Sequence, residues 1–264
     1  MVFILTGTEF EIVAAGTAIV LLLWAAIQDV KTREVDDLVW VLMLVLGIPF
    51  TGIRILLYGD DTTRLILMML SIFAGFILAF IILFSGLQGG ADAKALFCTS
   101  LVCPFPLTIS EVLPDKLIPF SITLFMNSLL LLIPFPLVIF VYNLIHRKEF
   151  DVLPNGSRWS HFLAQFLGYP AALEVIKRKH PWHYDFIEQR NEDNWSFKFR
   201  VTLGDPDGDL ARRKQILELA EKDGRNFLWI QPGVPFLVPF LVAFLISFLW
   251  GNLYFIILKH FFPL

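Results

Sequence analysis

Two aspartates border apolar segments of the sequence and are the side chains best suited to chemistry. Asp29 follows the apolar run 10–28, and Asp92 comes just before the run that starts at residue 93. Two carboxylates a few ångströms apart cannot both ionise easily, so the pair shares a proton near working pH. The ionised carboxylate can take a proton from water, and the protonated one can hydrogen-bond the carbonyl oxygen under attack. Brought together, Asp29 and Asp92 could therefore hydrolyse a peptide bond without a metal or a covalent intermediate.

The stretch before Asp92 is suited to hold an extended peptide. Gly86, Gly89 and Gly90 allow a sharp bend in the backbone, and Ala91 adds only a methyl group. A second chain could approach such a backbone closely and pair with it as a strand. We therefore expect Gly89, Gly90 and Ala91 to contact a bound substrate.

Each aspartate also has a simpler interpretation. Asp29 can be a polar residue at the end of a membrane helix, and Asp92 can cap the start of another. Either role alone would explain a single carboxylate in such a place. A shared chemical role requires the surrounding elements to bring the two residues to the same side of a membrane.

The composition is that of a membrane protein. The chain has 264 residues, of which 56% are hydrophobic and 17% charged, and its mean hydropathy is +0.69. A soluble domain of this length would carry more charge, and several apolar stretches are long enough to cross about 30 Å of hydrocarbon. We expect the fourth stretch, which contains small polar residues, to face other helices. We predict an α-helical polytopic membrane protein with six transmembrane helices, at 10–28, 38–58, 64–85, 93–111, 119–145 and 235–260.

A polar segment, residues 146–233, separates the fifth and sixth predicted helices and holds most of the Lys and Arg residues. Its apolar periodicity and its helix start and stop signals favour a small α/β unit. The predicted helices and strands are helices at 157–168, 169–179 and 209–222 and strands near 194–201 and 225–231. The expected parts of the chain are transmembrane helices 1–5 with both aspartates (1–145), the α/β module (146–233) and transmembrane helix 6 (234–264).

The distribution of basic residues predicts the orientation in the membrane. Lys and Arg concentrate in the 29–37 turn, the 86–94 turn and the polar module, including Arg147 and Lys148 directly after the fifth predicted helix. Loops rich in these residues face the cytoplasm, so we predict that these segments are cytoplasmic and that both termini lie outside. The two aspartates then lie at the same, cytoplasmic membrane face.

The sequence offers no convincing metal site. Cys98 and Cys103 lie five residues apart on one predicted helix, with no CxxC pattern and no His/Cys cluster. The acidic stretch 204–209 begins like a calcium loop, but Leu210 and Ile216 stand where that loop needs a glycine and a glutamate. We expect no metal, no cofactor and no nucleic-acid partner.

Two motifs resemble those of a known family of membrane proteases. Gly-Gly-Ala-Asp at 89–92, followed by Ala-Lys-Ala-Leu, resembles the second aspartate motif of the GxGD membrane proteases, with Ala91 in place of the second glycine. Gln-Asp-Val-Lys-Thr-Arg-Glu-Val-Asp-Asp at 28–37 resembles the first aspartate motif of their type IV prepilin peptidase branch. The six helices, the module before the last helix and the stretch 232–240 are most similar to the archaeal preflagellin (archaellin) peptidases.

The resemblance implies an aspartic endopeptidase with Asp29 and Asp92 as its catalytic pair. It would remove the short basic leader, the class III signal peptide, from preflagellin and prepilin-like precursors at the cytoplasmic membrane face. These precursors and membrane lipid are the expected partners. The four-cysteine zinc module of bacterial members has no counterpart among the motifs here, so the resemblance implies peptidase activity without their methyltransferase activity. Glu34 could attract the basic residues of the leader, whereas Asp36 and Asp37 could do the same or stabilise the start of the second helix.

Two other functions stay open on the sequence. A presenilin-like or signal-peptide-peptidase-like protease would cleave inside a transmembrane helix, but such proteins place their aspartates in mid-membrane. A proton-coupled transporter would also carry intramembrane acids, often with inverted repeats. No internal repeat is evident and both acids lie near one face, so we prefer the leader peptidase.

Overall fold

The computed structural model describes residues 7–85, 90–106, 118–146, 155–178, 184–191, 194–197 and 206–261. The chain forms two compact units. The first comprises residues 1–132 and 235–264, and the second comprises residues 133–234. The contacts therefore assign the helix after Ile133 to the second unit, although hydropathy groups it with the helices before it.

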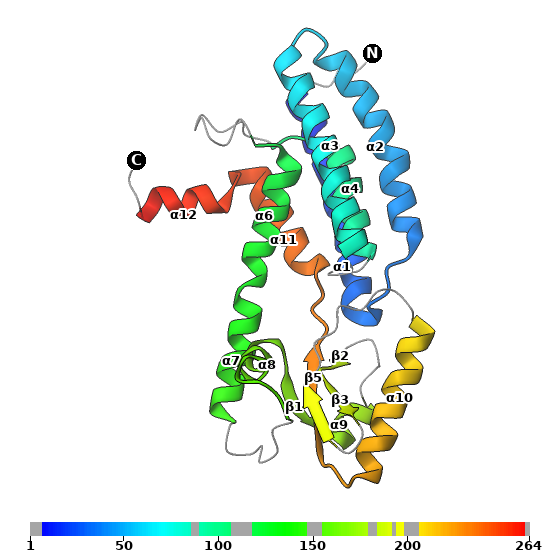
Figure 1. Ribbon diagram of the computed structural model, residues 1–264. Coiled ribbons are helices and arrows are strands. Elements are labelled where there is room, and N and C mark those ends of the chain that lie inside the picture. The colour runs from blue at the N-terminus through cyan, green and yellow to red at the C-terminus, as the bar shows by residue number, and fades with distance from the viewer. Residues whose placement is uncertain are drawn as a thin grey trace. The chain divides into compact units, whose positions relative to one another are not determined.

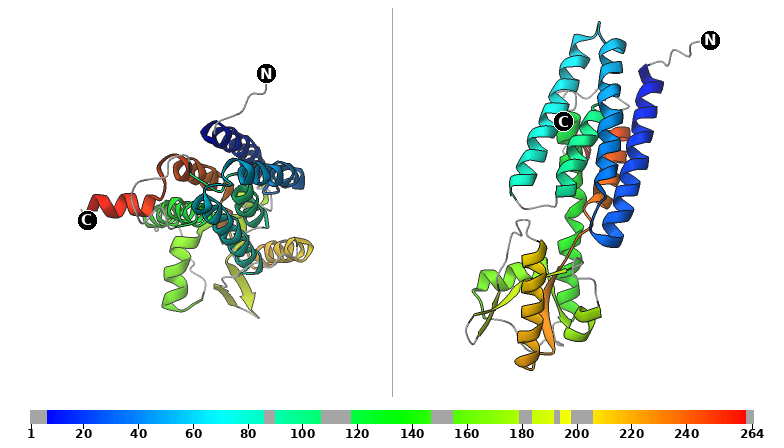
Figure 2. Two further views of the ribbon diagram at one scale, coloured as in Figure 1. Left: turned by 90° about the horizontal axis from the view of Figure 1, so that it is seen from above. Right: turned by 90° about the vertical axis from the view of Figure 1, so that its right-hand side faces the viewer.

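The first unit is helical (Figure 1). Its helices are α1 (Gly7–Thr32), α2 (Asp37–Leu57), α3 (Thr62–Ser85), α4 (Gly90–Val102), α6 (Phe120–Leu132), α11 (Leu237–Trp250) and α12 (Leu253–Phe261). Figure 2 shows α1, α2 and α3 running alongside one another. Short connections join α1 to α2 and α2 to α3, so the chain reverses direction at each, and α4 packs against both α2 and α3.

The helix lengths confirm a mostly helical membrane protein. Within the described residues four helices are long and apolar enough to cross a membrane, or five if the bent pair α11–α12 counts as one. The four are 7–32, 37–57, 62–84 and 120–145. The last of them consists of α6 and of α7 (Pro134–Ile145), which belongs to the second unit.

Helix α4 is shorter than the predicted crossing at 93–111. It has 13 residues, or about 20 Å of helix, and it ends at Val102 because Pro104 and Pro106 follow closely. Residues 107–117 lie outside the described part of the chain. Most α4 side chains are buried, which confirms that this helix faces other helices.

The last predicted crossing, 235–260, is divided into α11 and α12, which meet at an angle of 64°. Gly251 has φ 85°, a left-handed conformation that glycine adopts without strain. The buried Asn127 of α6 stabilises the break. Its amide nitrogen donates to Ser247 Oγ at 2.8 Å and to the Gly251 carbonyl at 3.0 Å, and its oxygen accepts from the Leu253 N–H at 2.9 Å. Backbone groups freed by the break are thereby satisfied.

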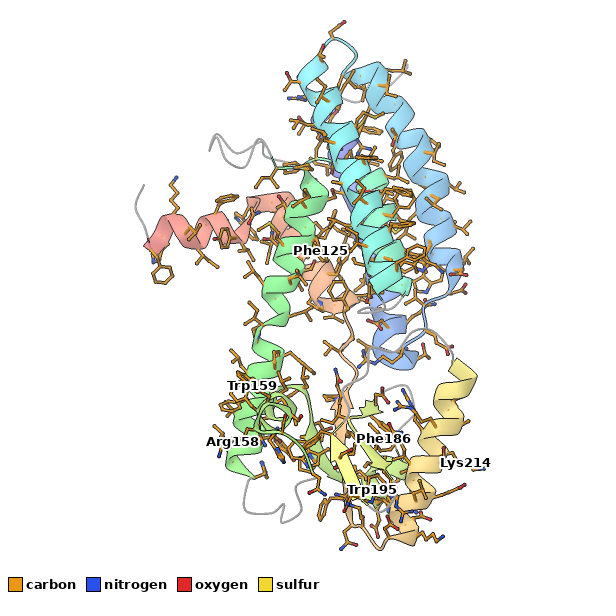
Figure 3. All side chains as sticks on the ribbon, viewed as in Figure 1. Phe125, Arg158, Trp159, Phe186, Trp195 and Lys214 are labelled. Atoms are coloured by element: carbon orange, nitrogen blue, oxygen red, sulfur yellow. The ribbon has the colours of Figure 1, made fainter. Side chains whose placement is uncertain are left out.

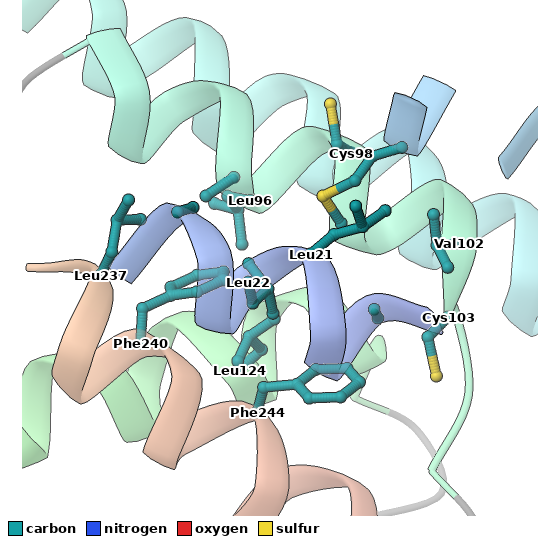
Figure 4. Close-up of a cluster of buried hydrophobic side chains, with 14 of the residues drawn as sticks. Leu21, Leu22, Leu96, Cys98, Val102, Cys103, Leu124, Leu237, Phe240 and Phe244 are labelled. Carbon is teal, nitrogen blue, oxygen red and sulfur yellow. The ribbon is translucent and has the colours of Figure 1, made fainter. Parts of the chain in front are cut away.

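One apolar core joins α1, α2, α3, α4, α6 and α11. Figure 4 shows Leu22 of α1, Leu124 of α6 and Phe240 and Phe244 of α11 packed together in it. Alanines on the inner face of α1 let neighbouring helices approach closely, as small residues do in membrane bundles.

An ion pair between Glu11 and Arg54 is buried in this unit, near the start of α1 and the end of α2. Arg54 is fully buried and donates from Nε to Glu11 Oε1 at 2.8 Å and from Nη2 to Oε2 at 2.6 Å. Arg54 Nη2 also donates to the carbonyl of Val102, the last residue of α4, at 2.8 Å. Arg54 therefore connects three helices, α1, α2 and α4.

The second unit combines helices with two small antiparallel sheets. Its elements are α7, α8 (Arg158–Leu167), β1 (Tyr169–Ala172), α9 (Leu173–Arg178), β2 (Tyr184–Phe186), β3 (Glu188–Asn191), β4 (Asn194–Phe197), α10 (Pro206–Lys222) and β5 (Phe227–Pro232). Strand β5 lies between β1 and β2, and β3 pairs with β4. A core that includes Ile176, Phe186, Ile216 and Leu228 fills the space under the larger sheet.

Most of the local structure predicted for this unit is confirmed. Helices form at α8 and α10, and strands form at β4 and β5. The helix predicted over 169–179 is wrong in its first part. Residues 169–172 are strand β1, because they pair with β5 from Tyr169 opposite Ile230 to Ala172 opposite Phe227, and helix begins only at Leu173.

Glu188 is a buried acid of the second unit. It is 1% exposed; its Oε1 accepts from the Trp229 N–H at 2.8 Å and its Oε2 from Arg225 Nη1 at 2.5 Å. Burial raises the pKa of Glu188, and the two donors offset that effect only in part.

Candidate active site

Asp29 lies in the last turn of α1, with 14% of its side chain exposed. Its Oδ2 accepts a hydrogen bond at 3.1 Å from the backbone N–H of Leu237, the first residue of α11. Its Oδ1 is 3.9 Å from Nη1 of Arg33. The carboxylate of one helix thus binds the N-terminus of another helix that is 208 residues away in the sequence.

The sequence at the start of α11 leaves this N–H available. The Val238 N–H donates to the Pro235 carbonyl at 3.2 Å, and Pro239 has no N–H. Helix N-termini carry unpaired N–H groups and a partial positive charge, both of which favour a carboxylate. Asp29 therefore acts as an end cap of α11 as well as a residue of α1.

The charged segment after Asp29 is an ordered turn. Arg33 has φ 61°, a left-handed conformation that costs a non-glycine residue of order 1–3 kcal/mol. Its N–H donates to the Asp29 carbonyl at 3.2 Å, which closes α1. Gln28 Oε1 accepts from the Asp36 N–H at 3.1 Å, so the side chain before Asp29 also holds the turn. The position of Asp29 is consequently fixed from both sides.

Asp92 lies in the first turn of α4 and is 8% exposed. It is the third residue of the helix, inside the first turn instead of at the capping position before it. Its neighbours Ala93 and Leu96 belong to the same core cluster as Ala25 and Ala26, one turn before Asp29 on α1. The end of α1 and the start of α4 are therefore at the same end of the helical unit (Figures 1 and 2).

The other residues predicted for the site differ in their exposure. Gly90 is exposed, and a Cβ atom added to it would meet no atom within 4 Å. Ala91 is half-buried, and Glu34 is exposed in the turn between α1 and α2. Gly89 lies outside the described residues. Open space at Gly90 leaves the backbone at the start of α4 accessible to another chain.

Sequence reasoning missed an ion pair at the same end. Lys94 Nζ is 2.6 Å from Asp37 Oδ1, which connects the first turn of α4 to the first turn of α2. Asp36 takes the capping role that was one alternative for it, since its Oδ1 accepts from the Leu38 N–H at 2.9 Å. The Leu237 N–H was also missed, because a backbone donor has no residue type that marks it in a sequence.

The titratable groups do not form a metal centre in the part of the chain that the structure describes. No group of three or more His, Cys, Asp or Glu side chains there is arranged to hold a metal ion. The candidate site comprises the two aspartates, the N-terminus of α11 and the charged turn, and these groups suit acid–base chemistry on a peptide.

Comparison with known proteins gives a consistent result along the chain. Residues 17–141 match the model of the type IV leader peptidase family, and residues 160–253 match the archaeal peptidase A24 C-terminus type II model. Both aspartates fall within the first match.

Curated relatives carry one common name. The chain is 32% identical over 132 residues to the preflagellin peptidase of Methanococcus voltae, a match that covers 47% of this chain and 54% of the relative. It is 25% identical over 226 residues to that of Methanocaldococcus jannaschii, with 82% of this chain and 85% of the relative covered. The helical unit with its two aspartates and the α/β unit each match a model from the same group of peptidases, and the chain belongs to the type IV leader peptidase family.

Proposed function

We propose that this protein is a membrane-embedded aspartic endopeptidase that removes the basic leader peptide from preflagellin-like precursors. The observation that carries the proposal is the placement of Asp29 and Asp92 at one end of a single helical unit, on helices that share a core. Membership of a leader peptidase family and similarity to preflagellin peptidases support the reaction and the substrate class.

In the proposed reaction the two carboxylates share one proton. One carboxylate takes a proton from the attacking water while the other donates its proton to the oxygen of the scissile carbonyl. Protons are redistributed as the amine leaves, and no covalent intermediate forms. The Leu237 N–H and Arg33 next to Asp29 would hold negative charge on the pair through the cycle.

Substrate would bind at the same end of the unit. The exposed backbone at Gly90 offers a partner for an extended peptide, with Gly89 and Ala91 on either side. Glu34, exposed in the turn after Asp29, would attract the basic residues of the leader. Binding would draw the end of α1 toward the start of α4 and so bring the carboxylates into contact.

The proposed membrane arrangement has six crossings, with the α4 region as the fourth and α11–α12 as the sixth. Both termini lie outside, and the 33–36 turn, the start of α4 and the polar module lie in the cytoplasm. Arg54, in the last turn of α2, is buried and paired with Glu11, so it adds no free positive charge to the face that this arrangement puts outside.

Single substitutions test the proposal. Asp29→Asn and Asp92→Asn should each reduce cleavage of a preflagellin in membranes at least about a hundredfold, because each removes one acid–base group. Asp60→Asn is the matched control, since Asp60 is exposed in the connection between α2 and α3 at the opposite end of the unit. Full cleavage by a folded Asp29 or Asp92 variant would contradict the proposal.

A further inference from the structure

Helix α8 presents an apolar face that the described residues of its own unit leave exposed. Trp159, Phe162 and Leu163 are 74%, 52% and 43% exposed. Their spacing of three and four residues places them on one side of the helix, and Phe166 continues the same side toward α7. Figure 3 labels Arg158 and Trp159 at the start of α8. An apolar helix face of this size needs a covering partner.

Helix α7 indicates which partner that is. It forms the second half of the apolar stretch 120–145, which is long enough to cross a membrane. Exposed aliphatic side chains form a stripe along α7 up to its last residue, namely Leu137, Val138, Val141, Leu144 and Ile145. Ile139 and Asn143, on the other side, are buried. Lipid must therefore surround this stripe as far as Ile145, because otherwise all of these side chains would face water.

Helix α8 packs at the level of the last two turns of α7. The rings of Phe140 and Phe166 stack with centroids 4.4 Å apart and an interplanar angle of 3°. Asn143 Nδ2 donates to the carbonyls of Gln165 at 2.9 Å and Gly168 at 2.7 Å. A helix held there lies at the boundary between hydrocarbon and water.

We infer that α8 is an interfacial helix that lies in the head-group region of the membrane, with Trp159, Phe162 and Leu163 among lipid chains. Tryptophan is enriched at this depth, and helices with Trp, Phe and Leu on one face and basic residues nearby bind anionic bilayers. Arg158 opens α8 and is exposed, which fits anionic lipid head groups. The inference depends on α7 lying in the membrane and is independent of the aspartate chemistry.

Spin labels on single cysteines test the depth of α8 in the full chain, reconstituted in vesicles that contain anionic phosphatidylglycerol. The labelled variants are Trp159→Cys and Phe162→Cys, and the matched control is Gln215→Cys on an exposed position of α10. The native cysteines are buried, and labelling of the unmodified chain measures their background. Labels at 159 and 162 should be relaxed more by oxygen than by a water-soluble nickel complex, and the label at 215 should show the reverse order.

Two results would overturn the inference. Labels at 159 and 162 that meet the nickel complex as readily as the label at 215 would show a helix in water. Labels shielded from both agents and dipolar-coupled between molecules would show that a second copy of the chain covers α8.

The lipid charge is tested with the same labels. In vesicles of neutral phosphatidylcholine the preference for oxygen at position 159 should fall, and Arg158→Gln should reduce the difference between the two vesicle types. An equal preference in both vesicle types would overturn the assignment of anionic lipid as the partner.

Discussion

Each end of α1 carries a carboxylate, and the two carboxylates have opposite environments. Glu11 near its start and Asp29 near its end are separated by about 27 Å along the helix. Both Glu11 oxygens accept short hydrogen bonds from the buried Arg54, and Tyr58 adds a third donor at 3.3 Å. Among the described residues, the Asp29 side chain accepts one hydrogen bond, from the Leu237 N–H, and Nη1 of Arg33 is 3.9 Å from its Oδ1.

The difference distinguishes an acid that stabilises the fold from an acid that is available for chemistry. At the Glu11 end, Arg54 also binds the Val102 carbonyl and lies 5.2 Å from the centre of the Phe10 ring, so the group is saturated and fixed. At the Asp29 end, Oδ1 has no short hydrogen bond to any of the described residues and can engage water or a second carboxyl group. A fixed end gives the bundle a rigid base against which the other end can rearrange.

The largest expected effect on stability comes from a substitution at the Glu11 end of α1. Arg54→Met leaves Glu11 buried without its partner and should lower the free energy of unfolding by about 3–5 kcal/mol. Thermal unfolding in detergent or bicelles measures the loss. The double variant Glu11→Leu/Arg54→Met should recover most of it, because apolar packing replaces a complete pair. Unchanged unfolding of Arg54→Met would show that this end is not fixed by the ion pair.

The hydrogen bond to Asp29 can be removed from the backbone side. Leu237→Pro deletes the N–H, and proline is tolerated in the first turn of a helix. Leu237→Ala is the matched control, since it loses the same buried side chain and keeps the N–H. We expect cleavage by the proline variant to be slower than that by the alanine variant by about ten- to a hundredfold, the value of a hydrogen bond to a charged group. Equal rates would mean that this N–H does not support the chemistry.

Glu188 in the second unit combines features of Glu11 and Asp29. It is buried and accepts from two donors, and its pKa is nevertheless raised. The native state therefore holds this proton at higher pH than the unfolded chain does. Its contribution to stability is complete below the ordinary pKa of 4.5 and is lost as the pH rises through the raised native value. Hydrogen exchange of the β5 amides between pH 4 and 7 should show this decline, and Glu188→Gln should flatten it. A steeper decline in the glutamine variant would contradict the assignment.

The smallest effect is expected for the surface pair at the aspartate end. Lys94→Met removes the ion pair with Asp37, whose side chains are 49% and 75% exposed. Exposed pairs contribute about 0–1 kcal/mol, so the melting temperature should change little. A large loss of stability would show that the aspartate end is held as firmly as the Glu11 end.

Much of this arrangement could be predicted from local patterns. Apolar length predicted the long helices, and the two crossings between Asp29 and Asp92 return the chain to the same face, which placed both residues at one end. Helix α8 could be located because Ser157 caps it and Gly168 closes it. These features depend on residues that are close together in the sequence.

What could not be predicted depends on long-range partners. Residues 169–172 were predicted to be helical because the strand with which they pair, β5, is distant in the sequence. Leu237 is 208 residues from Asp29, and Asn127 is 120 residues from Ser247, so no local sequence pattern predicts either contact. The length of α4 was overestimated because hydropathy continued past Pro104 and Pro106, whereas the helix stopped before them.

Cross-linking tests the central claim, that the carboxylates of residues 29 and 92 can meet. Asp29→Cys/Asp92→Cys should form an intramolecular disulfide in membranes when a preflagellin substrate is present. The control pair Thr17→Cys/Asp92→Cys, more than three turns away along α1, should not. Asp29→Cys alone accounts for bonds to the native cysteines. A 29–92 bond that forms with substrate supports the account, and no bond in the presence of bound substrate contradicts it.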